Sequence, residues 1–193
     1  LNPVLDADQL MKAIAMEFGL DVKGLDRLET LAVLNEFLLK QAGLNRVCVL
    51  IIDEAQDLTN DLLEQVRLLS NLEPTPQKLL QIILVGQPEL KELLDRTDLV
   101  QLKQRIMIRY HLAELSRDEV PSYITHRLKV AGAEVNFFTE DAMDMIYHVS
   151  SGLPRVINVL ADRAMMAAFS QGCQIIQPAI IELAQADLEG VRV

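Results

Sequence analysis

The chain has 193 residues, half of them hydrophobic, and a formal net charge of −10. This length suits one large domain or two small ones with a sizeable apolar core. The acidic balance argues against a general electrostatic attraction to DNA, RNA or acidic lipid, and no apolar segment approaches the roughly 18 residues that span a bilayer.

The first half of the chain is predicted to alternate helices with buried strands. Apolar residues at a helical period predict four helical segments, the last of them one or two short helices: residues 7–18, 27–42, 60–72 and 88–104. Thr59 offers the third segment an N-cap, and Pro74 and Pro76 close it.

The predicted strands fall between those helices. Continuous apolar runs predict buried strands over residues 47–52 and 81–86, and a mixture of β-branched and aromatic residues predicts a third strand over residues 105–112. Strands that alternate with helices indicate a parallel sheet of the α/β class.

The sequence changes character after Leu115. Only helices are predicted beyond it, and each has a start signal: a capping box at Ser116 and Glu119, the N-cap Thr139, and first-turn prolines at Pro154 and Pro178. We therefore expect an α/β part over residues 1–115 and an all-helical part over residues 116–193.

The strand over residues 47–52 is the element around which the first half is organised. Its unbroken apolar run is typical of a strand buried on both faces. Asp53 and Glu54 follow directly, at the edge where open α/β sheets place their ligands. Neighbouring side chains on an extended backbone point to opposite sides, so one carboxylate can hold Mg²⁺ through water while the other reaches a nucleophilic water. This is the Walker B arrangement of nucleoside triphosphatases; the alternative is a core strand that ends in a solvated acidic turn.

Three further side chains are candidates for the same site. Gln87 follows the second buried strand, where its amide can hydrogen-bond a γ-phosphate or the attacking water, or simply satisfy loop backbone groups. Arg105 stands where a helix gives way to a predicted strand, and it can reach a neighbouring subunit's nucleotide or form a surface salt bridge. Arg155 lies in the first turn of its helix, where a cation opposes the helix dipole, so we expect it to have an anionic partner.

Four ordered motifs carry a resemblance to the AAA+ ATPases: Asp53–Gln56, Leu84–Leu90, Gln104–Ile106 and Gly152–Asn158. More narrowly, the chain resembles the group that contains general secretion pathway protein A and the related secretion ATPases of pilus and exopolysaccharide loci. The opening Asn2-Pro3 and the later Phe18-Gly19-Leu20 also match this group. The resemblance covers nearly the whole chain.

This resemblance implies a role for each candidate residue. Asp53 would hold Mg²⁺, Glu54 would polarise the attacking water, and Gln87 would be sensor 1. Arg105 would be an arginine finger and Arg155 would be sensor 2 in a helical lid. The implied cofactors are ATP and Mg²⁺, and a finger that acts in trans implies a homo-oligomer, either a ring or a dimer.

The sequence departs from these ATPases at one point. None of its eight glycines belongs to a G-x-x-x-x-G-K-[ST] phosphate-binding loop. By the resemblance, the chain is a fragment that lacks the first strand and the phosphate loop of a partial AAA+ core. We therefore expect an ATPase in the full-length protein and no measurable hydrolysis by this fragment alone, with unpaired strand edges that favour aggregation.

Two other functions remain open from the sequence. A DNA-associated AAA+ ATPase of the transposition or replication-initiation type shares these motifs, although the acidic balance leads us to expect no nucleic acid partner. A binding module without catalysis is disfavoured by the pair Asp53-Glu54.

The expected partners are secretion or pilus assembly proteins. Two isolated cysteines, Cys48 and Cys173, suit the reducing cytoplasm; we expect no membrane contact from this fragment, and inner-membrane association only through segments outside it.

Overall fold

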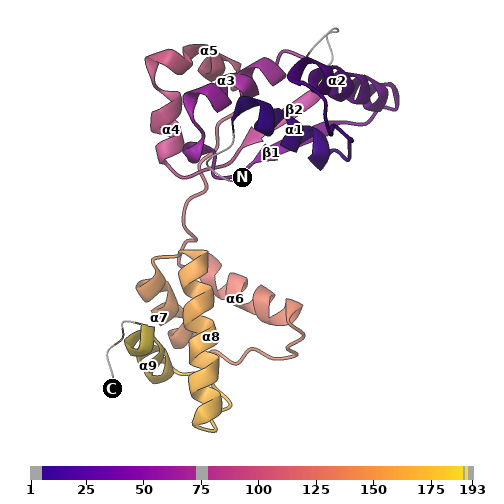
Figure 1. Cartoon of the computed structure of the whole chain (residues 1–193). Coiled ribbons are helices and arrows are strands. Elements are labelled where there is room, and N and C mark those ends of the chain that lie inside the picture. The colour runs from indigo at the N-terminus through magenta and orange to yellow at the C-terminus, as the bar shows by residue number, and fades with distance from the viewer. Residues whose placement is uncertain (1–5, 73–77, 189, 191–193) are drawn as a thin grey trace. The chain divides into compact units, whose positions relative to one another are not determined.

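The structure is a computed structural model, and it describes residues 6–72, 78–188 and 190. Its contacts separate two compact units, Leu1–Arg109 and Tyr110–Val193, which Figure 1 shows with their elements labelled. The boundary predicted after residue 115, and the roles assigned to the two parts, stay predictions. No helix among the described residues is long and apolar enough to cross a bilayer.

The first unit alternates helices and strands, as the apolar periodicity predicts. Its elements are α1 (Ala7–Glu17), α2 (Arg27–Gly43), β1 (Cys48–Ile52), η1 (Ala55–Asp57), α3 (Asn60–Leu69), β2 (Leu80–Leu84), α4 (Glu89–Leu94), η2 (Thr97–Leu99) and α5 (Val100–Arg105). The side chain of Thr59 accepts a hydrogen bond from the backbone N–H of Leu62, so the predicted N-cap of α3 is confirmed. Pro74 and Pro76, which were expected to close α3, lie outside the described residues.

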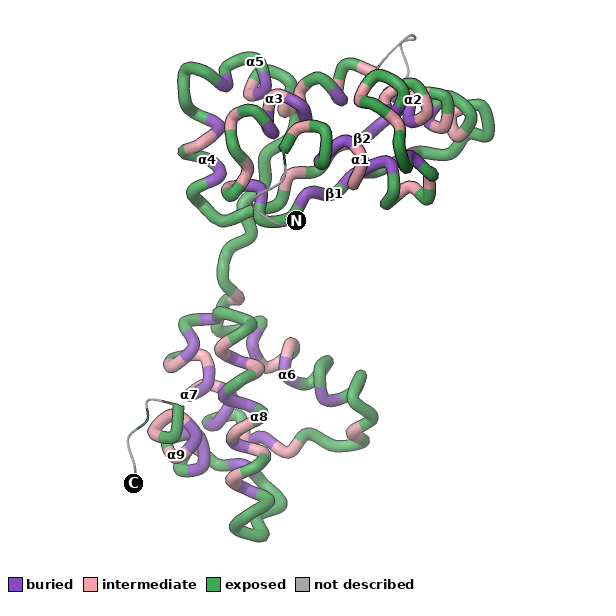
Figure 2. The backbone as a smooth tube through the Cα atoms, in the orientation of Figure 1, coloured by how far each residue is buried: buried purple, intermediate pink, exposed green. Residues whose placement is uncertain are grey.

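Strands β1 and β2 pair in parallel, in a register that runs from Cys48 opposite Leu80 to Ile52 opposite Leu84. These two strands are the whole sheet among the described residues. The third strand predicted over residues 105–112 is wrong, because α5 extends to Arg105 and the segment after it pairs with no described strand. Residues 107–114 are exposed, as Figure 2 shows for the segment between α5 and α6. The β propensity of this segment does not produce a strand, since its backbone groups have no neighbouring strand to bond.

Among the described residues, helices cover only one face of the sheet. Cys48, Leu50 and Ile52 are buried in the core of the first unit, together with apolar residues of α1, α2 and α3. The alternate residues Val49 and Ile51 are 44% and 62% exposed. The prediction that this strand is buried on both faces is therefore wrong among the described residues, because their helices pack against only one side of it.

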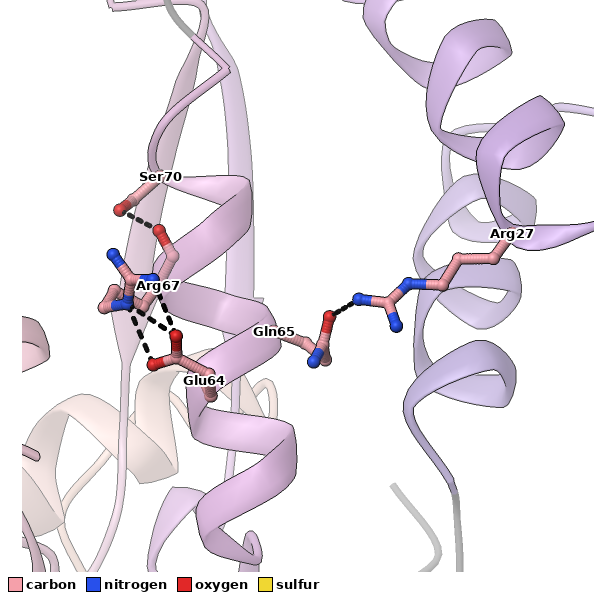
Figure 3. A network of polar contacts seen from close by, with 5 residues as sticks. All are labelled: Arg27, Glu64, Gln65, Arg67 and Ser70. Carbon is pink, nitrogen blue, oxygen red and sulfur yellow. Dashed lines mark hydrogen bonds and ion pairs between the residues drawn. The ribbon is translucent and has the colours of Figure 1, made fainter. Parts of the chain in front are cut away.

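A buried polar contact joins two helices of the first unit. Gln65 of α3 is a polar side chain in the core, and its Oε1 accepts a hydrogen bond from the guanidinium of Arg27 at the beginning of α2 (Figure 3). On the same helix, Arg67 pairs with Glu64, and the hydroxyl of Ser70 donates to the carbonyl oxygen of Arg67 at 2.6 Å. The side-chain oxygen of Gln65 thus has a hydrogen-bond partner, as a buried polar group requires.

The second unit contains four helices and one isolated β-bridge, between Phe138 and Ile176, among its described residues. The helices are α6 (Glu119–Val130), α7 (Glu140–Ser150), α8 (Pro154–Ser170) and α9 (Pro178–Leu188). They enclose a separate apolar core that receives side chains from all four. The predicted helix starts at Thr139, Pro154 and Pro178 are confirmed. The predicted capping box is incomplete, because the carboxylate of Glu119 accepts both the N–H and the hydroxyl of Ser116, which leaves α6 without a side-chain N-cap.

Candidate active site

Asp53 and Glu54 lie at the carboxyl end of β1, where the strand ends at Ile52. The backbone of Glu54 is left-handed, with φ 51° and ψ 41°. The expectation of an extended backbone through both acids is therefore wrong at Glu54. Instead, the N–H of Glu54 donates to Oδ1 of Asp53 at 2.9 Å. A left-handed conformation is uncommon for a residue other than glycine, and such residues gather at functional sites.

The turn after Glu54 is anchored to the neighbouring strand end. Ala55 is completely buried, and its N–H donates to the carbonyl oxygen of Val85 at 2.9 Å. The N–H of Val85 in turn donates to the carbonyl oxygen of Ile52 at 2.9 Å. These two bonds extend the pairing of β1 and β2 by one step and fix η1 beside the loop that follows β2.

The structure brings Gln87 to Glu54, although 33 residues separate them. Nε2 of Gln87 donates to Oε2 of Glu54 at 3.2 Å. The same oxygen accepts a second hydrogen bond, from Nε2 of Gln56 at 2.6 Å. The backbone N–H of Gln87 donates to Oε1 of Gln56 at 3.0 Å. Glu54, Gln56 and Gln87 thus form a closed ring of hydrogen bonds at the carboxyl edge of the sheet.

This ring has an electrostatic consequence for Glu54. Its pKa is lowered from its ordinary value, first by the hydrogen bond from Gln56 and then by the one from Gln87. Both bonds stabilise the ionised carboxylate, which is the form that can polarise a water molecule. The side chain is nevertheless exposed, so a water molecule can approach it.

Asp53 has the chemistry that a magnesium site requires. Its carboxylate is exposed, and one oxygen is directed by the N–H of Glu54. Mg²⁺ retains several of its waters and is typically held by one or two carboxylates together with substrate phosphates. Among the described residues no group of three or more histidine, cysteine or acidic side chains forms a dedicated metal cage. The residues present therefore fit a water-mediated site of this kind.

Gln56 belongs to this site and was not singled out by the sequence. Its amide lies so close to Gly86 that a Cβ at that glycine would come within 2.6 Å of Oε1 of Gln56. The sequence places Gln56 in the motif Asp53–Gln56, two residues after Glu54, but gives it no role of its own. A glutamine in a surface turn has many possible partners, and only the pairing of β1 with β2 selects Gln87.

Arg105 is the last residue of α5 and is exposed. Its side chain makes no hydrogen bond or ion pair with any residue in the described part of the chain. Its basic neighbours behave differently: Lys103 pairs with Asp95 at 2.7 Å, and Arg109 approaches the same carboxylate at 3.8 Å. The surface salt bridge that the sequence left open for Arg105 is therefore not formed within residues 6–72, 78–188 and 190.

Arg155 lies in the first turn of α8, directly after Pro154 at the helix start. It is exposed, and no anionic side chain of the described residues pairs with it. The partner that its position calls for is therefore not supplied by the described residues. Arg155 belongs to the second unit, whereas Asp53, Glu54, Gln87 and Arg105 belong to the first.

Comparison with known proteins shows what the chain is similar to. Residues 2–94 match the family described as AAA domain. The chain is 42% identical, over all of its 193 residues, to General secretion pathway protein A of Aeromonas hydrophila. The match covers 35% of that relative, so the chain spans about a third of its length.

Solved structures show the same fold at low sequence identity. Cdc6p from Pyrobaculum aerophilum is 21% identical with a TM-score of 0.70, over 93% of this chain and 49% of that one. The Aeropyrum pernix ORC2 protein, solved as ADPNP–ADP complexes, is 15% identical with a TM-score of 0.71, over 98% and 51%. RuvB from Thermotoga maritima, titled a Holliday junction branch migration motor, is 18% identical with a TM-score of 0.56, over 78% and 49%.

The fold is therefore a partial AAA+ fold, an α/β core followed by a helical unit. Within that class, the chain is related to general secretion pathway protein A.

Proposed function

We propose that the chain is part of an ATP-hydrolysing AAA+ protein that powers or regulates the assembly of a bacterial secretion or pilus apparatus. The observation that carries the proposal is the group formed by Asp53, Glu54 and Gln87, in which two acids and an amide are hydrogen-bonded at one sheet edge. An edge of this kind is where open α/β sheets bind their ligands. The relationship to general secretion pathway protein A supports the cellular role.

Each residue of this group has a defined task in the proposed reaction. The carboxylate of Asp53 binds a water-coordinated Mg²⁺, which neutralises charge on the phosphate oxygens when bound. Glu54, ionised and exposed, accepts a hydrogen bond from the attacking water and aligns it. The amide of Gln87 contacts the γ-phosphate or the same water, because it shares the edge with Glu54.

The two unpaired arginines complete the proposed site with positive charge. Arg105 contacts the nucleotide of a neighbouring subunit, and Arg155 contacts the phosphates from the helical unit. Neither is paired to an acid within the described residues, so both guanidinium groups are available for a phosphate. Arg105 acting in trans requires a homo-oligomer, either a ring or a dimer.

The proposal also includes a phosphate-binding loop outside these residues. The 193-residue sequence contains no G-x-x-x-x-G-K-[ST] segment, and the backbone N–H groups and lysine of such a loop provide much of the affinity for the phosphates. The chain by itself is therefore expected to bind ATP weakly and not to hydrolyse it measurably. Clear turnover by the chain alone would contradict this assignment.

Glu54→Gln in the complete protein tests the enzymatic part of the proposal. Loss of a positioned general base lowers a rate by about 10² to 10⁴, so we expect turnover to fall by roughly that factor while ATP binding persists. Glu36→Gln is the matched control, since Glu36 is exposed on α2 and forms none of the hydrogen bonds of the candidate site. Equal turnover in the Glu54→Gln variant and the wild type would refute the proposed site.

A DNA-associated ATPase is the second candidate. The ORC1 protein of Aeropyrum pernix, solved in complex with DNA, has the same fold with a TM-score of 0.66. The net charge of −10 disfavours nucleic acid binding by this chain. DNA affinity of the complete protein that falls steeply with salt would favour this second function, and loss of secretion or pilus assembly in cells that lack the protein would favour the first.

A further inference from the structure

We propose that Gln56 is a positioning residue for the reaction proposed above, which holds the carboxylate of Glu54 against the loop that carries Gln87. The inference rests on the proposed function and adds to it a residue with a distinct role. Gln56 touches neither substrate nor metal in this scheme, and it acts only through Glu54 and Gln87.

The side chain of Gln56 uses both ends of its amide. Its Nε2 donates to Oε2 of Glu54 at 2.6 Å, and its Oε1 accepts the backbone N–H of Gln87 at 3.0 Å. One group thereby connects η1 to the loop after β2. An amide offers a donor and an acceptor side by side, whereas an ionised carboxylate lacks the donor and a hydrocarbon lacks both.

The surrounding backbone makes room for this amide. Gly86 stands directly before Gln87, and a Cβ there would lie 2.6 Å from Oε1 of Gln56, as well as 3.1 Å from Cδ2 of Leu90. A substituent at Gly86 would therefore displace the amide of Gln56 or shift the loop. On the other side, buried Ala55 fixes the turn from which Gln56 projects.

The hydrogen bond from Gln56 is the shorter of the two that hold Glu54. Without it, the exposed carboxylate would depend on the 3.2 Å bond from Gln87 alone. A glutamate side chain with this freedom samples several rotamers, and each departure from the reactive geometry lowers the rate of the chemical step. Glu54 acts on the water and not on the nucleotide, so the loss should lower kcat and leave KM for ATP unchanged.

Kinetics of the complete protein test this role. In Gln56→Leu we expect kcat about tenfold lower and KM for ATP within about twofold of the wild-type value. In Gln56→Glu we expect kcat to fall by at least as much, because the substitution places a second carboxylate beside Glu54. Gln56→Asn keeps the amide but is one methylene shorter, so it should lie between the wild type and Gln56→Leu. Gln101→Leu is the matched control, since Gln101 is exposed on α5 and contacts none of these residues.

Gly86→Ala tests the same role in a second way, because its new Cβ would displace the amide of Gln56. We expect it to lower kcat by itself and to have a smaller effect in a Gln56→Ala background, where the amide that it crowds is gone. Equal effects of Gly86→Ala in the two backgrounds would mean that Gly86 does not act through Gln56. That result would overturn the proposed coupling.

Hydrogen exchange gives a readout that does not depend on activity. In Gln56→Leu the backbone amide of Gln87 should exchange faster, whereas the amide of Val85, which donates to Ile52, should not change. Unchanged exchange at Gln87 overturns the inference, and so does an active enzyme whose kcat is insensitive to Gln56→Leu. If the wild-type protein hydrolyses no ATP, the proposed function fails instead, and the exchange at Gln87 still decides whether Gln56 holds the loop.

Discussion

The backbone N–H of Leu115 donates to the carbonyl oxygen of Gly152 at 3.0 Å, and a Cβ on Gly152 would lie 2.0 Å from the carbonyl oxygen of Leu115. Gly152 also has a φ of +79°. Only glycine therefore fits this position, for both its backbone conformation and its contact. The contact attaches the segment at the beginning of the second unit to the turn before α8, two residues before Pro154 and three before Arg155.

Gly152→Ala should destabilise the second unit by more than a left-handed backbone alone explains. We expect a loss of at least about 3 kcal/mol, because the new methyl group clashes with backbone atoms that cannot rotate away. Gly172→Ala is the control: Gly172 has a φ of +68° and nothing within 4 Å of a Cβ, so it should cost only about 1 kcal/mol. Denaturant midpoints of the two variants measure the difference, and equal losses would contradict the close contact.

The stability of the second unit should depend on pH through Asp144. Its pKa is lowered, first by the hydrogen bond from Arg117 and also by the charge of His148, whose Nε2 lies 3.5 Å from Oδ2. A carboxyl whose pKa is depressed on folding contributes stability above its unfolded pKa of about 3.9, and this contribution is lost as the pH falls through the folded value. Arg117→Gln should remove much of this dependence.

Thermal unfolding between pH 7 and pH 2 measures the effect of Arg117→Gln. Arg127→Gln is its control, because Arg127 is exposed on α6 and has no acidic partner among the described residues. The melting temperature of Arg117→Gln should equal that of the control at the acidic end of the range and fall below it near neutral pH. A constant difference between Arg117→Gln and the control across the whole range would show that Arg117 does not act through Asp144.

Arg105→Ala should abolish ATP hydrolysis by the complete protein while leaving ATP binding largely intact, because the finger acts on the transition state in a neighbouring subunit. Mixing this variant with Glu54→Gln should restore part of the activity. In a mixed oligomer, some sites then receive an intact Glu54 from one subunit and an intact Arg105 from the next. Steady-state turnover of the mixture measures this, and no recovery at any mixing ratio would argue against action in trans.

Ile51→Ala and Leu50→Ala in the 193-residue chain should differ sharply in stability. Leu50 is 9% exposed and lies in the core, so its truncation should cost about 2–5 kcal/mol. Ile51 is 62% exposed on the uncovered sheet face, and its truncation should cost less than about 1 kcal/mol. Chemical denaturation measures both. A larger cost for Ile51→Ala in the complete protein would show that another part of that protein covers this face.

Much of the fold could be predicted because its signals are local. Helix α7 begins where Thr139 offers a cap, and α8 begins at Pro154, since both signals act within one turn of the chain. Local signals also produced the wrong prediction of a strand over residues 105–112. Its alternating β-branched and aromatic residues express a preference, but a strand forms only where another strand is present to accept its backbone hydrogen bonds.

Some features of the candidate site could likewise be predicted from the sequence, and others could not. The sequence by itself determined that Asp53, Glu54 and Gln87 follow two apolar runs that form strands, and parallel pairing places the ends of such strands at one edge. Only the tertiary structure decided that Glu54 is left-handed, that Gln56 and Gln87 bind the same carboxylate oxygen, and that Gly152 meets Leu115. Apolar periodicity is a local property of the chain. The choice of one hydrogen-bond partner over another depends on which distant segments the packed core brings together, and no local pattern encodes that.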